Sequence, residues 1–242
     1  MKIIVTGTYE ELSKKASDIV EEVMKNNDKP VLGLATGSTP IGMYKDLIKK
    51  YENNQLDFSN TITFNLDEYI GLSKDNPSSY NYFMENEFFK HINIEKNNAH
   101  VPYPSEDEKY IKEYERLMEE SGGLDIQVLG IGPNGHIAFN EPAEFLLANT
   151  GVVDLTEDTI KANSRFFDSI EDVPTKAVTL GMADIFSAKK IILLANGKNK
   201  ADAIKNLLTG NYISTTHPAS LLKLHRDVTI IVDEEAYSKV EV

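Results

Sequence analysis

The chain has 242 residues, of which 25 are Lys or Arg and 38 are Asp or Glu, so its net charge is −13. This length, with 41% hydrophobic residues, predicts a globular protein and excludes a disordered or collagen-like chain. No basic run is longer than two residues, which argues against a nucleic-acid partner. The absence of Cys excludes thiolate catalysis and Cys–zinc sites and is compatible with a cytoplasmic location.

Apolar runs in the sequence are too short to span a bilayer, and the opening MKIIVTG does not resemble a signal peptide. We therefore expect no membrane partner.

Short β-branched runs alternate with amphipathic stretches. Strands are expected at Lys2–Thr6, Val31–Ala35, Thr61–Leu66, Ile126–Gly130, Ala177–Leu180, Ile191–Leu194 and Val228–Val232. Helices are expected at Glu10–Asn26, Pro40–Tyr51, Ser79–His91, Glu106–Glu120, Thr156–Ala162, Lys200–Leu208 and Pro218–Leu224.

This alternation predicts an α/β fold, with an open and mostly parallel sheet flanked by helices. No repeat or linker interrupts it, so residues 1–242 are expected to form a single domain. In such a sheet, ligands bind beyond the carboxyl ends of the strands. Three loops at those ends carry most of the functional information.

The first loop, LATGSTPIGMY, joins an expected strand to an expected helix. Thr36, Gly37, Ser38 and Thr39 are small or hydroxyl-bearing, and a helix begins directly after them. Backbone N–H groups at a helix start favour a phosphate. An ordinary strand-to-helix turn capped by Ser or Thr would look the same.

The second loop, TFNLDEYIGL, places Asp67 and Glu68 just past a buried strand. A carboxylate there can serve as a general base, although a turn or helix-capping role is also open. Adjacent residues of an extended segment point to opposite sides, so we expect at most one to face a site.

The third loop, LGIGPNGHIAFNEP, combines three glycines with Asn134, His136 and Glu141. Its glycines match the dinucleotide-binding pattern G-x-G-x-x-G. Pro133 and the early NEP sequence leave little room for the helix that such a site needs. A rigid loop that pairs His136 with Glu141 for proton transfer is the better interpretation.

Other candidates are less specific. The remaining histidines show no metal-binding spacing and are interpreted as structural: His91, His100, His217 and His225. Arg165, Lys198 and Lys200 are either surface cations or the local positive charge that a phosphate needs in an acidic protein.

Together, LGLATGSTP, FNLDEYIGL, LGIGPNGHIAFNEP and KANSRFF resemble the glucosamine-6-phosphate deaminase family. The resemblance runs from Lys2 to about Ala236, in the family's order and spacing. It implies a Rossmann-like three-layer sandwich that converts glucosamine 6-phosphate and water into fructose 6-phosphate and ammonia, with no metal or cofactor. A related 6-phosphogluconolactonase, a ketose–aldose isomerase and a non-catalytic sugar-phosphate-binding module are the alternatives.

The resemblance also implies roles for single residues. Asp67 matches the carboxylate that moves a proton between C2 and C1, and His136 matches the ring-opening acid/base with Glu141 as partner. Asn134 stands where some members carry Asp. The residues that match the phosphate pocket are Thr36, Gly37, Ser38, Thr39, Arg165 and Lys200.

Two departures bear on regulation and assembly. Ser38 replaces a glycine common in the family. Some members are hexamers activated by N-acetylglucosamine 6-phosphate, through basic residues after the NEP motif and a longer carboxyl terminus. Here the segment Ala143–Leu155 after the NEP motif has no Lys or Arg, and the chain stops soon after its last expected strand. We therefore expect an unactivated monomer or small homo-oligomer.

Overall fold

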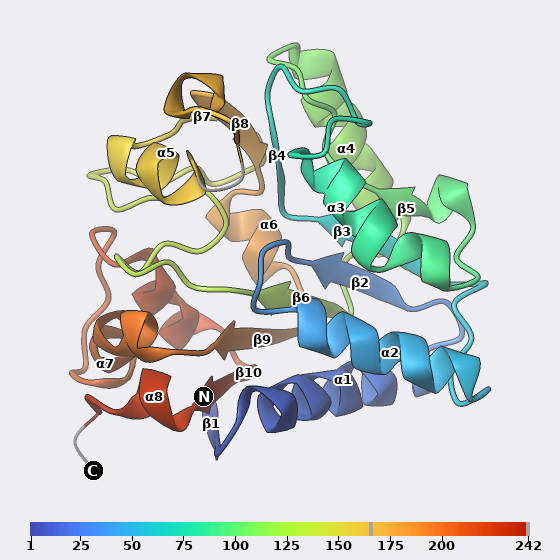
Figure 1. Cartoon of the computed structure of the whole chain (residues 1–242), viewed down its shortest axis with the longest axis horizontal. Coiled ribbons are helices and arrows are strands. Elements are labelled where there is room, and N and C mark those ends of the chain that lie inside the picture. The colour runs from blue at the N-terminus through green and yellow to red at the C-terminus, as the bar shows by residue number, and fades with distance from the viewer. Residues whose placement is uncertain (165–166, 241–242) are drawn as a thin grey trace.

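The computed structural model describes residues 1–164 and 167–240, except for the side chains of residues 158 and 162. Its main sheet has seven strands in the order β1-β10-β9-β6-β2-β3-β5, all pairing in parallel (Figure 1). The strands are β1 (Lys2–Thr6), β2 (Val31–Leu34), β3 (Ile62–Asn65), β5 (Ala99–His100), β6 (Ile126–Leu129), β9 (Lys190–Ala195) and β10 (Val228–Asp233). The predicted parallel α/β sheet is confirmed.

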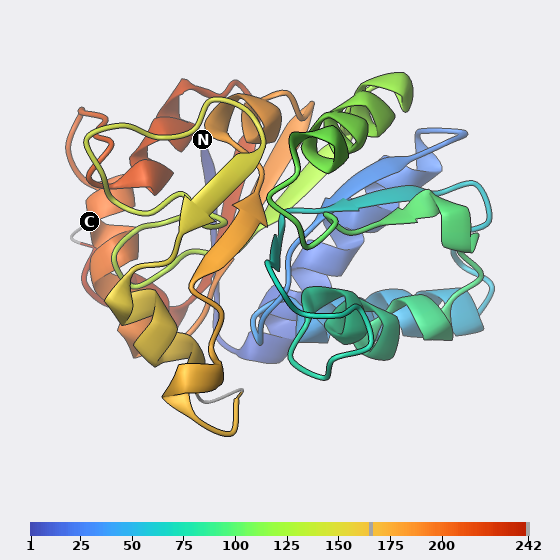
Figure 2. The same cartoon turned by 90° about the horizontal axis from the view of Figure 1, so that it is seen from above.

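Helices cover both faces of this sheet, with α1, α2 and α3 on one face and α4 and α6 on the other (Figure 2). Because both faces are covered, every residue of β2, β3 and β6 is buried, as expected for apolar parallel strands. The helices are α1 (Tyr9–Lys25), α2 (Ile41–Glu52), α3 (Tyr80–Glu87), α4 (Glu108–Glu120), α5 (Glu157–Asn163), α6 (Met182–Phe186), α7 (Ala201–Leu208) and α8 (Glu234–Tyr237).

The strand order reverses direction between β2 and β6. From β2 the chain proceeds through β3 to β5 at one edge, and from β6 it proceeds through β9 and β10 toward the other edge. The loops that follow β2 and β6 therefore diverge at the carboxyl edge of the sheet. Such a switch point is where open α/β sheets bind ligands.

A second, smaller sheet corrects part of the sequence-based prediction. The expected strand Ala177–Leu180 is β8 (Lys176–Thr179), and it lies outside the parallel sheet. It pairs antiparallel with β4 (Asp67–Tyr69) and with β7 (Gly151–Asp154). β4 and β5 were not predicted because they have only three and two residues, and β7, with the sequence GVVD, was not predicted because it has only two consecutive apolar residues.

Some expected helices are shorter or tighter than predicted. The stretch Ser79–His91 forms α3 and then a separate 3₁₀ turn, η1 (Phe89–His91), while Pro218–Leu224 is wholly 3₁₀ (η6). Further 3₁₀ turns in the described part of the chain lie at η2 (Lys96–Asn98), η4 (Ile170–Asp172) and η5 (Lys198–Lys200). Among the described residues, no helix is long and apolar enough to cross a membrane.

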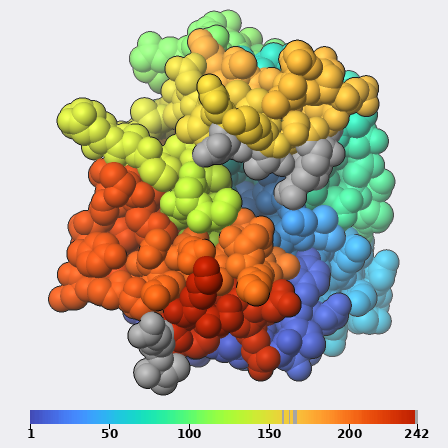
Figure 3. All heavy atoms as spheres, turned by 60° about the vertical axis from the view of Figure 1, so that its left-hand side comes forward, coloured from blue at the N-terminus to red at the C-terminus, as the bar shows by residue number. Residues whose placement is uncertain are grey.

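Two segments distant in sequence meet at the surface. The backbone N–H of Ala143 donates to the carbonyl of Thr215 at 3.3 Å. In Figure 3, the yellow-green segment stands out from the surface beside the orange segment of the carboxyl-terminal third. Phe145 in this projecting loop is 80% exposed.

Candidate active site

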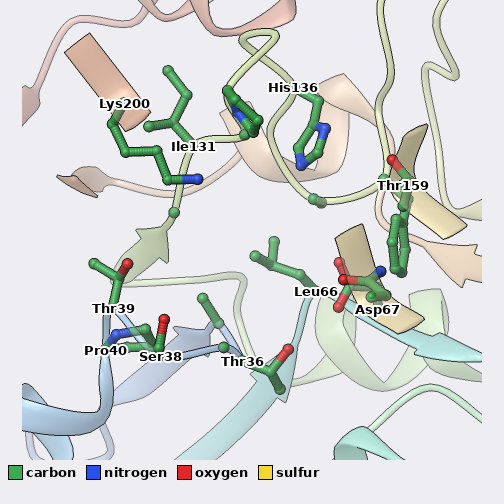
Figure 4. Close-up of a pocket in the computed structure, with 18 of the residues that line it drawn as sticks. Thr36, Ser38, Thr39, Pro40, Leu66, Asp67, Ile131, His136, Thr159 and Lys200 are labelled. Atoms are coloured by element: carbon green, nitrogen blue, oxygen red, sulfur yellow. The ribbon is translucent and has the colours of Figure 1, made fainter. Parts of the chain in front are cut away.

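A cavity of about 380 Å³ opens at the switch point between β2 and β6. Its walls come from the loops after β2, β3, β6 and β9, together with α5 and Tyr80 at the start of α3. In the view of Figure 4, Ser38, Thr39 and Lys200 lie on one side and Asp67 and Thr159 on the other, with His136 between them. The three loops singled out in the sequence thus meet in one cavity.

The loop after β2 wraps one end of the cavity with residues 35–40. Gly37 has a φ of +95°, a backbone conformation that residues other than glycine rarely adopt. Thr39 donates its hydroxyl to Oδ1 of Asn196 at 2.9 Å, which ties the loop to the turn after β9. Thr39 therefore lines the cavity with its hydroxyl proton engaged by Asn196.

Tyr9, at the start of α1, braces this loop from outside the cavity. Its hydroxyl accepts from the N–H of Gly42 at 2.8 Å and donates toward the carbonyls of Ser38 and Thr39, each at 3.0 Å. One phenol thus satisfies a free N–H in the first turn of α2 and holds two carbonyls of the loop. Tyr9 lies 27 residues before Thr36, and no motif in the sequence pointed to it.

Positive charge reaches the same end of the cavity. Lys200 lines the cavity, whereas Lys198, at the other end of η5, does not contribute to its described walls. Gly197 in this turn has a φ of +84° and donates its N–H to both carboxylate oxygens of Asp233, which anchors the turn. Arg165, the other expected cation, lies outside the described residues.

Asp67 and Glu68 face opposite ways in β4. Asp67 lines the cavity and is 7% exposed, and burial, with the nearby charge of Glu68, raises the pKa of Asp67 to about 8. Glu68 accepts backbone N–H groups from Tyr69, Tyr80 and Asn81 at 2.8–2.9 Å. Thus Asp67 faces the cavity, while Glu68 binds the first turn of α3.

His136 and Glu141 are paired, as predicted. Nδ1 of His136 lies 2.8 Å from Oε1 of Glu141, which leaves the Nε2 edge of the ring toward Gly132. Asn134 donates its amide to Oε2 of Glu141 at 2.7 Å, and Thr159 donates its hydroxyl to Oε1 at 2.6 Å. Burial would raise the pKa of Glu141, but the contacts with His136, Thr159 and Asn134 outweigh it, so the pKa lies below its usual range.

Gly132 makes room for the ring of His136. A Cβ on Gly132 would lie 2.4 Å from Nε2 of His136, so only glycine admits the ring there. The N–H of Gly132 donates to the carbonyl of His136 at 2.9 Å, which closes the loop on itself. No helix lies between β6 and β7, as expected when the fingerprint was set aside.

Comparison with known proteins decides the family. Residues 6–231 match the model of the family described as glucosamine-6-phosphate isomerases/6-phosphogluconolactonase. The chain is 58% identical over 242 residues to a glucosamine-6-phosphate deaminase of Thermoanaerobacter sp. (strain X514), covering 99% of this chain and 95% of the relative. The chain belongs to the glucosamine-6-phosphate deaminase family. It is also 51% identical to the enzyme of Clostridium beijerinckii, with both chains fully covered.

Solved structures of a deaminase and of a lactonase resemble the chain to different degrees. A monomeric glucosamine-6-phosphate deaminase superposes with a TM-score of 0.95 at 48% identity, covering 99% of this chain and all of that one. A 6-phosphogluconolactonase from Trypanosoma cruzi superposes with a TM-score of 0.77 at 21% identity, covering 100% and 97% of the two chains. The second likeness shows a shared fold alone.

Within this deaminase-family site, the sequence patterns did not reveal the residues that hold the expected site residues in place by hydrogen bonds. Thr159, Asn196 and Tyr9 contact the expected residues Glu141, Thr39 and Ser38 but lie on different segments, so no spacing linked them to the motifs. His217 packs its ring against Gly135, where a Cβ would lie 2.0 Å from Nδ1, consistent with a structural role. Among the described residues, no three His, Asp or Glu side chains gather to hold a metal ion.

Proposed function

We propose that this cavity converts glucosamine 6-phosphate and water into fructose 6-phosphate and ammonia, and that the residues expected from sequence perform the steps. The proposal rests on one observation: a buried carboxyl, Asp67, faces the same cavity as the His136–Glu141 pair and a loop suited to phosphate. Binding alone would need neither a base nor a proton shuttle.

The phosphate of the substrate binds at the end of the cavity formed by the loop 36–39 and Lys200, with Arg165 as a further expected ligand. Backbone N–H groups before α2 and the ammonium of Lys200 offset its charge in a protein of net charge −13. This contact fixes the sugar, so that C1, C2 and O5 are presented to the acid and base groups.

His136 opens the pyranose ring by taking the proton of the C1 hydroxyl and giving a proton to O5, so that the C1–O5 bond breaks and an aldehyde is left at C1. Glu141 holds the imidazole through Nδ1 and stabilises its charged form. Asn134 donates to the other oxygen of Glu141 and thereby supplies an uncharged support for the pair.

Asp67 then removes the proton from C2, and the electron pair forms the C1–C2 double bond while O1 takes a proton from the neighbouring ammonium, which gives an enol bearing a neutral amine. The same carboxyl returns a proton to C1, and the nitrogen lone pair forms the C=N bond of a protonated imine at C2. Water adds to C2 and ammonia leaves, so that the ketone of fructose 6-phosphate forms. Because the pKa of Asp67 is raised to about 8, the carboxylate is a stronger base than an exposed Asp.

The ammonium group of the substrate also affects the ionisation of Asp67. Its positive charge beside a buried carboxyl favours the ionised, basic form of Asp67. A substrate without the amine would not provide this charge. The proposed preference for an amino sugar therefore arises in part from the burial of Asp67.

A coupled assay of ammonia release from glucosamine 6-phosphate tests the function. Equal production of ammonia and fructose 6-phosphate is expected, with little hydrolysis of 6-phosphogluconolactone. Binding of glucosamine 6-phosphate without turnover, or turnover of the lactone alone, would contradict the proposal and favour the sugar-phosphate-binding module or the lactonase.

We further propose that residues 1–242 act as one cytoplasmic domain. Both sheets contribute walls to the same cavity, which supports a single unit. The absence of Cys fits a reducing compartment. A monomer is the proposed assembly, supported by the likeness to a monomeric deaminase.

A further inference from the structure

We propose that Thr159 is a positioning residue for the ring-opening step: it fixes the carboxylate of Glu141, and through it the imidazole of His136, from a separate helix. The inference rests on the proposed function. It assigns to α5 a part in proton transfer in addition to its place in the cavity wall.

A directed chain of hydroxyl groups leads to Glu141. Thr156 caps α5 by accepting the N–H of Thr159 at 3.2 Å, and its own hydroxyl donates to Oγ1 of Thr159 at 3.1 Å. Oγ1 of Thr159 accepts from Thr156, and its single proton is donated to Oε1 of Glu141 at 2.6 Å. An ionised carboxylate can only accept, so Glu141 sets the direction of both hydrogen bonds.

The Glu141 carboxylate needs such a constraint. The last torsion of a glutamate side chain is broad and roughly two-fold, so packing alone sets it weakly. Its side chain is only 10% exposed, and a buried carboxylate must be held by donors. Three side chains from two segments contact it, with Asn134 and His136 in one loop and Thr159 on α5.

Thr159 is the donor that shares an oxygen with His136. Both lie against Oε1, whereas Asn134 binds Oε2. Without the threonine hydroxyl, the carboxylate can rotate about its last bond while keeping its contact with Asn134. Nδ1 of His136 would then lose a fixed acceptor, and the Nε2 edge would lose its orientation toward the substrate.

The burial of Thr159 supports a role beyond local helix capping. Thr159 is 6% exposed and lines the cavity, and Asn163 lines it one helical turn later. The position of α5 is thereby linked both to the cavity wall and to the acid/base pair. A helix shifted by substrate contacts would carry the Thr159 hydroxyl with it.

The experiment compares Thr159→Val, which keeps the shape and removes the hydroxyl, with Thr159→Ser, which keeps the hydroxyl. We expect Thr159→Val to lower kcat for glucosamine 6-phosphate about tenfold, the typical effect of losing a hydrogen bond to a charged group. KM should change little, and Thr159→Ser should retain most of kcat. Thr61→Val is the matched control, because this buried threonine makes no hydrogen bond through Oγ1 and lies at the amino-terminal end of β3.

A double-mutant cycle gives the sharper test. In a Glu141→Gln background, Thr159→Val should cost much less than in wild type, because the two residues act as one unit. Should Thr159→Val fail to fold in a thermal melt, Thr159→Ala replaces it in both backgrounds.

Three outcomes would overturn the inference. Equal losses for the serine and valine variants would assign Thr159 to packing. A raised KM with unchanged kcat would assign it to direct substrate contact, and additive losses in the cycle would separate it from Glu141. All three presuppose wild-type ammonia release, whose absence would instead contradict the proposed function.

Discussion

Asp67 and Glu68 are neighbours in β4, yet Asp67 faces the cavity, whereas Glu68 binds two backbone N–H groups in the first turn of α3 and the N–H of Tyr69. The pleat of the strand separates their roles. Glu68 is held in place by its donors, while its charge helps to raise the pKa of Asp67. Two adjacent acids thus form one base and one structural anchor.

Asp67→Asn should abolish turnover and leave substrate binding nearly intact. The change keeps the shape and removes the basicity, so that only the proton transfer suffers. A general base contributes about 10²–10⁴-fold, and kcat should fall within that range while the dissociation constant from calorimetry stays close to wild type. Exchange of solvent tritium into C1 and C2 should vanish as well.

Glu68→Gln is the matched control for this variant. It removes a charge one residue further on, at the opposite side of β4, so it should lower the melting temperature and retain most of kcat. A variant Asp67→Asn that keeps more than about a tenth of wild-type kcat would contradict the role of Asp67 as base.

The buried carboxyl of Asp67 also makes stability depend on pH. Its pKa is about 8 in the folded protein and about 3.9 in an unfolded chain. Between these values the folded state keeps a proton that the unfolded state releases, so the free energy of unfolding falls as pH rises. Asp67→Asn removes this titration. In urea unfolding, the free energy of unfolding of the Asp67→Asn variant should therefore exceed that of wild type by more at pH 9 than at pH 5. An equal difference at the two pH values would show that the pKa of Asp67 is not raised by burial.

Sequence patterns located the site but could not orient it. The strand–turn–helix pattern placed the loop 36–39. Strand alternation predicted that at most one of Asp67 and Glu68 would face the cavity, and the family resemblance favoured Asp67. In the structure Asp67 lines the cavity, and its strand β4 pairs antiparallel with β8. This pairing joins residues more than 100 positions apart, and no local signal encodes it.

The supporting contacts were equally out of reach. Tyr9, Thr159 and Asn196 each bind an expected residue from a different part of the chain. A tyrosine at a helix start or a threonine within a helix has many ordinary explanations. Only the tertiary fold brings their hydroxyl or amide groups within hydrogen-bonding distance of the loops.

His136→Gln should impair ring opening more than enolisation. The imidazole is oriented by Glu141 as a proton shuttle, and glutamine keeps polarity but cannot transfer the proton. An analogue blocked at O4 and O5, which remains open, should escape much of the defect. His91→Gln, at an exposed position, is the control and should behave as wild type. Equal losses for cyclic and open substrates would show that His136 acts at another step.

Lys200→Ala should weaken binding chiefly through the phosphate. A charge-assisted hydrogen bond is worth about 1.5–3 kcal/mol, so affinity should fall roughly 10- to 100-fold. Arg165→Ala is expected to act in the same way. Binding of glucosamine without phosphate should be weak in wild type and little changed by either variant. Lys198→Ala, beside the cavity wall, is the control, and equal losses for both sugars would indicate a structural role for Lys200.

N-acetylglucosamine 6-phosphate should not activate this enzyme. Activation requires a second anion site whose occupancy favours one global state, and a bound phosphate needs cations or free N–H groups to replace its hydration. Members of the family that respond to this compound use basic residues just after the NEP motif. Here the segment Ala143–Leu155 carries only Glu144 and Asp154 as charges, and these acids would repel a phosphate.

Initial rates at sub-saturating substrate, with and without N-acetylglucosamine 6-phosphate, decide this prediction. The rate should depend hyperbolically on substrate concentration in both cases. Mild competitive inhibition is expected, because the compound shares the phosphate and sugar ring that the cavity between Lys200 and Asp67 would hold. A sigmoidal dependence on substrate that becomes hyperbolic when the compound is added would contradict the prediction, because it would require a second anion site outside the acidic segment after the NEP motif.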